Sequence, residues 1–302
     1  MDKTIELIIK QNEELFGTTP KIERINVGFT NTIYNISDTY IVKICSNIEN
    51  EEKFKKEIDF YLVNKENNLI PKLYKYSVDK SLVPCYYEIL EKVEGVTLYN
   101  VWHTYNESQR KDIIRQLCEA MKNMHENKGK KYDWSDYMKK RFDSLFDQVK
   151  KMGILSKEEQ KLIEEAYSLF DEYLKSDEFV LVHNDLHFDN IFVHDGKIKV
   201  IDFERSMYAP RDYELAIIYR MIRKPWKFAS EETEKYTDVN QYSNIIDYIG
   251  EYYPKIINTP NLYKRLAIYD IVYMLKHLIE YPHLDELKKD ILEAVQLVMK
   301  ER

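Results

Sequence analysis

The segment LVHNDLHFDNIFVHDGKIKVIDFE, residues 181–204, places Asp, His and Asn side chains next to two short apolar runs. The runs IFV and KIKVIDF flank Asp195 and Gly196, and Asp-Gly between apolar runs is a strong signal for a β-hairpin. Buried polar groups are costly unless something pairs with them. The segment therefore predicts either a polar surface turn or a set of side chains that converge on a ligand.

The spacing of the polar residues around this hairpin favours the ligand. Asp185 and Asn190 come just before the first strand, and Asp202 follows the second. Because a hairpin brings its two ends together, we expect Asn190 and Asp202 to be neighbours, and their amide and carboxylate oxygens are hard ligands that suit Mg²⁺. Asp185 is then placed to accept a proton from a hydroxyl group. Phosphoryl transfer requires such a set, with a metal ion for the phosphates and a carboxylate that orients the nucleophile.

Two other interpretations of the segment stay open. Carboxylates are common turn formers, so a polar turn before a surface hairpin accounts for each Asp taken alone. His183, Asp185 and His187 alternate along the chain and would share one face of a strand, which is also compatible with a transition-metal site. That site would leave Asn190 and Asp202 unexplained.

The composition restricts the class of protein. The chain has 302 residues, 44% of them hydrophobic and 32% charged, which is enough for one large domain or two lobes. A net charge of −7 disfavours binding to nucleic acid. Three scattered cysteines argue against a disulfide framework and for a reducing compartment. The charged N-terminal segment does not read as a signal peptide, and no apolar run is long enough for a membrane span. We therefore expect a cytoplasmic monomer with neither nucleic acid nor a membrane as a partner.

The order of predicted elements divides the chain in two. Residues 3–16 have helical spacing, KIERINVGFTNTIYNIS and TYIVKIC alternate like strands, FKKEIDFYLV is helical, and YYEIL is strand-like. After residue 96 the pattern is mostly helical, with capping signals at Asn106 and Ser156. The sequence predicts a small α/β part followed by a large helical part with one embedded hairpin. A cleft between two such parts is a common place for a ligand.

The motif HNDLHFDN followed by IDF resembles the catalytic loop and metal-binding segment of the aminoglycoside phosphotransferase family, which are relatives of the protein kinases. The resemblance implies an α+β, protein-kinase-like fold of two lobes. The small N-terminal β-sheet lobe would cover residues 1–92 and the large, mainly helical lobe residues 93–302. It also implies that Asp185 is the catalytic base and that Asn190 and Asp202 hold Mg²⁺, while His183 supports the loop.

The first lobe should then supply the groups that contact phosphate. Lys43 in YIVKICS lies where the family has a lysine that contacts the α- and β-phosphates, and Glu57 in FKKEIDFY corresponds to its usual carboxylate partner. Thr30 and Asn31 fall in the segment that would cover the phosphates, although this segment has just Gly28 and lacks the glycine pattern of protein kinases. An exposed edge-strand lysine and a plain hairpin turn stay open as alternatives.

The stretch YYEILEKVEGVTL resembles the linker between the lobes in that family. The backbone near Glu91 and Val93 would bind the purine, and Leu90 would control access to the deeper pocket. Backbone recognition leaves little trace in the side chains, so ATP and GTP both remain candidates.

The residues after the hairpin favour a small-molecule kinase over a protein kinase. Glu204 replaces the glycine of the D-F-G motif, and the short distance from Phe203 to PRDYELA leaves no room for a long activation loop. In that second motif, Asp212 resembles a buried family residue that ties the helical lobe to the catalytic loop.

The expected reaction is Mg²⁺-dependent transfer of the γ-phosphoryl group of ATP or GTP to a small-molecule hydroxyl. An aminoglycoside antibiotic is the leading acceptor, and choline, homoserine or a sugar is the alternative within the same fold. A catalytically silent nucleotide- or drug-binding protein is the rival class, and it would be signalled by loss of a motif residue. Candidate wall residues of the acceptor site are Asp133, Asp136, Trp226, Asp270, Tyr273, His277 and Glu280.

Overall fold

The computed structural model describes residues 3–25 and 31–300, which form two compact units. Unit 1 comprises residues 1–124 and 187–206, and unit 2 comprises residues 125–186 and 207–302. Thr30 and most of the predicted phosphate-covering segment lie outside the described residues. The two compact units do not test the lobe boundary expected at residue 92, which stays a prediction.

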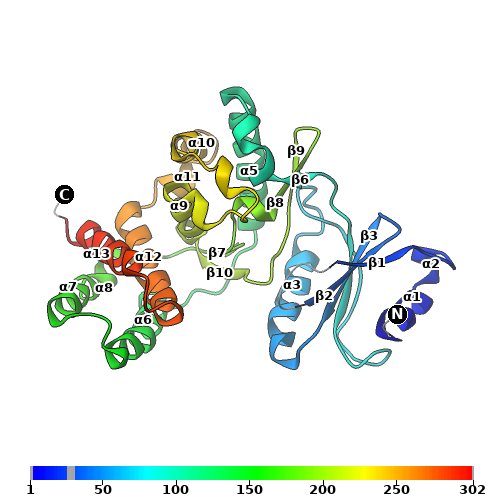
Figure 1. The fold of residues 1–302 in the computed structure, drawn as a ribbon, viewed down its shortest axis with the longest axis horizontal. Helices are drawn as coiled ribbons and strands as arrows, with labels where there is room; N and C mark the ends of the chain where they lie inside the picture. Colours follow the sequence, from blue (N-terminus) through cyan, green and yellow to red (C-terminus); the bar gives the residue numbers. More distant parts are fainter. Residues whose placement is uncertain (1–2, 26–30, 301–302) are drawn as a thin grey trace. The chain divides into compact units, whose positions relative to one another are not determined.

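An antiparallel sheet of five strands forms the core of unit 1 (Figure 1). Its order is β1-β2-β3-β5-β4, so β3 pairs with a strand on each side. Lys43 therefore lies on a central strand, which removes the alternative of an edge-strand lysine. The strands are β1 (Ile22–Ile25), β2 (Asn31–Ile36), β3 (Tyr40–Cys45), β4 (Leu73–Ser77) and β5 (Tyr87–Glu91).

Helices pack against this sheet. The helix predicted over residues 3–16 is interrupted at Asn12, whose side-chain amide donates to the carbonyl of Ile8, and it becomes α1 (Lys3–Gln11) and α2 (Glu13–Phe16). Helix α3 (Glu51–Val63) lies beside the sheet and buries Phe54 and Ile58 (Figure 1). Apolar side chains of α1 join those of the sheet in one cluster, which includes Ile5, Ile8, Tyr34, Val42 and Ile89.

The predicted hairpin is confirmed and belongs to a second, three-stranded sheet of unit 1. Strands β8 (Ile191–His194) and β9 (Lys197–Val200) are joined through Asp195 and Gly196, and β6 (Val96–Thr97) pairs with β8. Asp195 and Gly196 have φ angles of 47° and 74°, as a tight hairpin turn of type I′ requires.

Unit 2 is mainly helical, with one two-stranded sheet of β7 (Phe179–Val182) and β10 (Met207–Pro210). The capping signals are confirmed. Asn106 and Gln109 cap the start of α5 (Glu107–His125), which belongs to unit 1 up to Met124, and Ser156 caps the start of α7. No described helix is both long and apolar enough to cross a membrane. The other helices of unit 2 are α6 (Trp134–Met152), α7 (Lys157–Tyr167), α8 (Phe170–Tyr173), α9 (Leu215–Arg223), α10 (Ile245–Tyr252), α11 (Pro254–Ile257), α12 (Leu262–Glu280) and α13 (Asp285–Met299).

Candidate active site

A buried ion pair joins the sheet of unit 1 to α3. The ammonium of Lys43 lies 2.5 Å from Oε2 of Glu57, and the two residues are 8% and 1% exposed. Burial opposes the charge on Lys43, but the carboxylates around it, Glu57 first, raise the pKa of Lys43 above its ordinary value. The lysine therefore carries its charge within the protein, which is the state that a phosphate-binding lysine requires.

Asp202 lies next to this pair, at the end of the hairpin. Its Oδ1 is 3.9 Å from the ammonium of Lys43, and its φ of 67° puts it in the left-handed region that non-glycine residues seldom adopt. The next residue, Phe203, stacks on Phe60 of α3 at 3.9 Å between ring centroids and meets the edge of Tyr61. These aromatic contacts hold the backbone of Asp202 against the helix that carries Glu57.

Asn190 and Asp202 lie at the two ends of the hairpin, and the structure brings these ends together. Ile191 pairs with Val200, and the N–H of Ile201 donates to the carbonyl of Asn190 at 3.0 Å. An amide oxygen and a carboxylate at adjacent positions fit Mg²⁺, which keeps several ligands from water and from substrate phosphates. Across residues 3–25 and 31–300, no group of three or more His, Cys, Asp or Glu side chains is arranged to hold a metal ion, so the transition-metal alternative has no support.

The predicted linker residues lie at the end of β5. Leu90 is buried, and the carboxylate of Glu91 accepts from the N–H of Lys72 at 3.0 Å and from the ammonium of Lys199 at 2.9 Å. The side chain of Glu91 is thus structural, and any purine contact there would be made by backbone. Asn31 begins β2, in register with Cys45 at the end of β3.

A hollow of about 990 Å³ borders this linker within unit 1. The segment 91–94, α5 and the β8–β9 turn line it, and a Cβ at Gly95 just beyond would overlap the carbonyl of Val193. None of Lys43, Glu57 and Asp202 lines it. The hollow therefore does not contain the groups predicted to contact phosphate or metal.

Asp185 lies in the loop that follows β7 in unit 2. Its N–H donates to Nδ1 of His183 at 3.2 Å, and His183 is fully buried, as expected for a residue that supports the loop. The carboxylate of Glu214 accepts from the N–H of His183 at 2.8 Å and from the N–H of Asn184 at 3.2 Å. The two residues before Asp185 are therefore held by a single buried carboxylate.

The sequence assigned this tie to Asp212, and the structure corrects the assignment. Asp212 accepts from the guanidinium of Arg265 at 2.7 and 2.8 Å and from the hydroxyl of Tyr269 at 2.8 Å. It therefore joins the turn after β10 to α12, while Glu214, two residues later, holds the catalytic loop. Both acids belong to the motif PRDYELA. The direction in which each side chain leaves the folded turn decides which of them reaches the catalytic loop.

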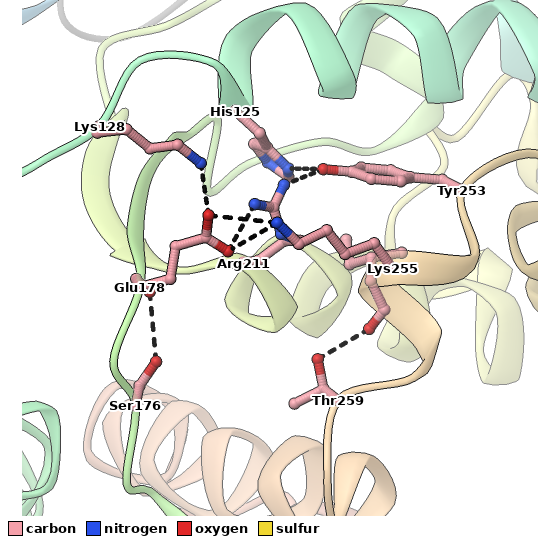
Figure 2. Close-up of polar contacts among 9 residues, drawn as sticks. His125, Lys128, Ser176, Glu178, Arg211, Tyr253, Lys255 and Thr259 are labelled. Atoms are coloured by element: carbon pink, nitrogen blue, oxygen red, sulfur yellow. Dashed lines mark hydrogen bonds and ion pairs between the residues drawn. The ribbon is translucent and has the colours of Figure 1, made fainter.

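A chain of hydrogen bonds links Arg211 through Tyr253 to His125 (Figure 2), and His125 in turn contacts Glu214. Nε2 of His125 lies 3.3 Å from the carboxylate of Glu214, and Nδ1 lies 2.9 Å from the hydroxyl of Tyr253. Burial lowers the pKa of His125, and a neutral ring beside a carboxylate carries its proton on Nε2. Tyr253 then donates to Nδ1 and accepts from Arg211. Sequence reasoning did not select His125, which ends a helix and has no motif around it.

The chain of hydrogen bonds ends in an ion cluster near the surface (Figure 2). Arg211 donates to Glu178 at 2.7 Å, and the ammonium groups of Lys128 and Lys255 lie 2.6 and 3.3 Å from the same carboxylate. Burial opposes the shift, but these donors lower the pKa of Glu178 to about 2. The cluster thereby fixes Arg211, the first donor in the chain.

The acidic residues expected to line the acceptor site have partners inside unit 2. Asp270 is buried and accepts from Arg220 at 2.6 Å and from Arg223 at 3.2 Å, and the guanidinium of Arg220 also stacks on the ring of Tyr273. The remaining acids are engaged as well: Asp136 with Lys140, Glu280 with Lys276 and His277, and Asp133 as the N-cap of α6. The buried carboxylate of Asp270 is thereby neutralised by two guanidinium groups, whereas the pair of Asp136 and Lys140 is exposed and Asp133 caps a helix.

The small antiparallel sheet with its lysine–glutamate pair, the catalytic-loop motif and the hairpin that ends in Asp202 define a phosphotransferase of the protein-kinase-like class. The model of the phosphotransferase enzyme family matches residues 21–241, and the chain belongs to that family. Comparison with curated protein sequences finds no match.

Solved structures of aminoglycoside phosphotransferases share the fold over nearly their whole length. Aminoglycoside phosphotransferase APH(2'')-Ib with bound ADP is 17% identical, with a TM-score of 0.68 over 98% of this chain and 97% of that chain. A thermostable mutant of APH(4)-Ia in complex with ADP and hygromycin B is 16% identical, with a TM-score of 0.62 over 97% and 99%. A mutant of aminoglycoside 2'-phosphotransferase-IIIa in complex with GDP is 14% identical, with a TM-score of 0.64 over 98% and 95%.

Proposed function

We propose that the protein transfers the γ-phosphoryl group of ATP or GTP to a hydroxyl group of a small molecule. The observation that carries the proposal is the buried ion pair of Lys43 and Glu57 with Asp202 3.9 Å from the same ammonium. A lysine held by a helix carboxylate, beside an aspartate suited to a metal ion, is the arrangement that phosphoryl transfer uses. Family membership supports the same reaction class.

Each residue of the site has a distinct part in this reaction. Lys43, held by Glu57, binds and orients the phosphates. Asn190 and Asp202 would hold Mg²⁺, which when bound neutralises charge on the phosphates. The carboxylate of Asp185 accepts the proton of the acceptor hydroxyl, and Glu214 fixes the loop that presents it. Proton acceptance by a positioned carboxylate contributes about 10²–10⁴-fold to such rates.

The linker backbone supports recognition of a purine without choosing between ATP and GTP. Among the described residues, the N–H of Val93 makes no backbone–backbone hydrogen bond, and it is the donor that a purine ring nitrogen would use. The solved structures of the same fold include complexes with ADP and with GDP. Both nucleotides therefore belong in the test.

An aminoglycoside is the first acceptor class, because solved structures that share the fold include aminoglycoside phosphotransferases, one of them in complex with hygromycin B. A second class, hydroxyl metabolites with fewer positive charges, is favoured by one observation. The carboxylate of Asp270 is buried between Arg220 and Arg223, so it is already neutralised. An acceptor such as choline, homoserine or a sugar does not need a wall of unpaired carboxylates.

The test is release of nucleoside diphosphate in the presence of Mg²⁺, with ATP and GTP supplied separately. The acceptor panel contains several aminoglycosides together with choline, homoserine and sugars, and the Asp185→Asn variant serves as the inactive control. Release that depends on one acceptor and disappears in the variant supports the proposal and identifies the acceptor. Tight nucleotide binding with no release for any acceptor would instead favour the silent binder.

A further inference from the structure

Glu88 is a buried carboxyl group to which the proposed reaction assigns no part. It lies in the middle of β5, is 0% exposed, and neither of its carboxylate oxygens has a hydrogen-bond partner among the described residues. The register of β3 and β5 places it directly opposite Lys43. Residues directly opposite in an antiparallel pair project from the same face of the sheet, so Glu88 faces the ammonium that would contact phosphate.

The groups around Glu88 carry more negative than positive charge. Among the described residues, Lys43 is the cation that acts on Glu88, and the carboxylates of Glu57 and Asp202 lie close to the same ammonium. The charge of Glu88 helps to raise the pKa of Tyr61 on α3, and Tyr76 on β4 pairs with Glu88 in the sheet. Burial raises the pKa of Glu88 well above its usual value, Glu57 adds to the rise, and Lys43 opposes it. A carboxylate buried without a hydrogen-bond donor is costly, so both the geometry and the direction of the pKa shift favour the neutral acid at Glu88.

We propose that Glu88 is a positioning residue that controls whether Lys43 is available to the nucleotide. As a neutral acid, Glu88 does not attract the ammonium of Lys43, which then interacts with Glu57 and with the phosphates. After it releases its proton to solvent, its carboxylate attracts Lys43 and repels the phosphates. This inference rests on the proposed function, because it takes Lys43 as the phosphate-binding lysine.

Binding of the nucleotide and binding of the proton are then linked. A polyanion that enters beside Lys43 adds negative charge near Glu88, which favours the protonated acid, and linkage requires that protonation favours the polyanion equally. Alkaline pH should therefore weaken nucleotide binding through this one residue. Turnover of the bound complex should be much less affected, since Glu88 touches neither Asp185 nor the acceptor in this mechanism.

The decisive experiment measures Kd for Mg²⁺–ATP and Mg²⁺–GTP against pH in the wild type and in Glu88→Gln, which has the shape of the neutral acid. The ratio of the two Kd values cancels the titration of the nucleotide itself. We expect a ratio near one in acid and at least about tenfold weaker binding by the wild type in alkali, because the added negative charge on Glu88 repels the phosphates. A ratio that stays constant with pH would overturn the proposal.

Two further readouts separate this role from a merely structural one. Infrared difference spectra should show the carbonyl band of a protonated carboxylic acid that disappears in Glu88→Gln, and absence of that band at neutral pH would also overturn the proposal. Glu52→Gln removes an exposed carboxylate of α3 and should keep the pH profile of the wild type. If neither nucleotide binds to the wild type at any pH, the proposed function fails and this inference fails with it, a result distinct from a constant ratio.

Discussion

Lys43 on β3 and Glu57 on α3 meet at 2.5 Å with almost no access to solvent. Removal of two charges from water is expensive, and their attraction repays it only while both partners are present. The pair therefore contributes less to net stability than its short distance suggests. Removal of one of the two partners is costly, because the charge of the other partner then stays buried without compensation.

Replacement of Lys43 should separate stability from catalysis. Lys43→Met should lower the free energy of unfolding by about 3 kcal/mol or more, because it leaves Glu57 buried without its partner. The double variant Lys43→Met/Glu57→Leu should recover most of that loss while its phosphotransfer stays at background. Thermal denaturation and diphosphate release measure the two effects. A single variant as stable as the wild type would show that the pair is not buried in solution.

The left-handed backbone of Asp202 calls for two different substitutions. Asp202→Asn keeps a side chain that tolerates a φ of 67°, so it should remove the metal-binding charge without backbone strain. Asp202→Ala should lose the same charge and an additional 1–2 kcal/mol, roughly, of stability. Titration of nucleotide binding with Mg²⁺ should show a weakened response in both variants. Asp195→Asn is the matched control, since Asp195 also has a positive φ but lies exposed in the hairpin turn.

Asp185 should be needed for turnover and not for nucleotide binding. Asp185→Asn keeps the size of the side chain and removes its capacity to accept a proton, so kcat should fall by about 10²–10⁴-fold. Kd for the nucleotide should stay within about twofold, because we assign the phosphates to Lys43, Asn190 and Asp202. Asp189→Asn, in the same loop but bonded to Thr97, should have a much smaller effect on kcat. Wild-type kcat in Asp185→Asn would refute the assignment of the base.

Local spacing accounts for what the sequence revealed of this site. The hairpin that joins Asn190 to Asp202 is encoded by a turn and two strands within a dozen residues, and Lys43 is paired with Glu57 on the next helix. Glu88 escaped notice because its significance depends on the register of β5 against β3, which no local pattern specifies. A glutamate inside the apolar stretch YYEIL was the available signal.

The residues that support the catalytic loop were harder to assign from sequence. Asp212 and Glu214 are both acidic and both buried, and the direction of each within one short turn decides which of them reaches the loop. The acidic acceptor wall stays a prediction, but the partners of its acids were likewise not visible in the sequence. Asp270 meets Arg220 and Arg223 from a helix about fifty residues earlier, and such a pairing is visible only after folding.

Glu214 should act on catalysis through the loop that it holds. Glu214→Ala removes the acceptor for the N–H groups of His183 and Asn184, and each buried donor left without a partner costs about 1–3 kcal/mol. We expect kcat to fall while Kd for the nucleotide stays near the wild-type value. Glu214→Gln retains one acceptor oxygen and should lie between the wild type and Glu214→Ala in both stability and kcat. An equal loss of kcat and of nucleotide affinity would contradict a role confined to the loop.

The pH dependence of stability tests the buried contact between His125 and Glu214. Burial lowers the pKa of His125, so the unfolded chain binds more protons at this residue below about pH 6.5, its ordinary value, and stability must fall as the pH decreases. Glu214 acts in the same direction at lower pH. Burial raises the pKa of Glu214, but its contacts with His125 and His183 together outweigh burial and lower that pKa below its ordinary value.

His125→Asn should therefore flatten the decline in unfolding free energy between about pH 6.5 and about pH 4.5. The variant should be less stable than the wild type at pH 8, because it loses the contacts of His125 with Tyr253 and Glu214. Denaturant unfolding at several pH values measures both effects. His283→Asn is the control, since His283 is exposed and its loss should leave the profile unchanged. If the wild type and His125→Asn lose stability in parallel as the pH falls, the neutral state assigned to His125 is wrong. The direction assigned to the hydrogen bonds between Arg211 and the catalytic loop would then be wrong as well.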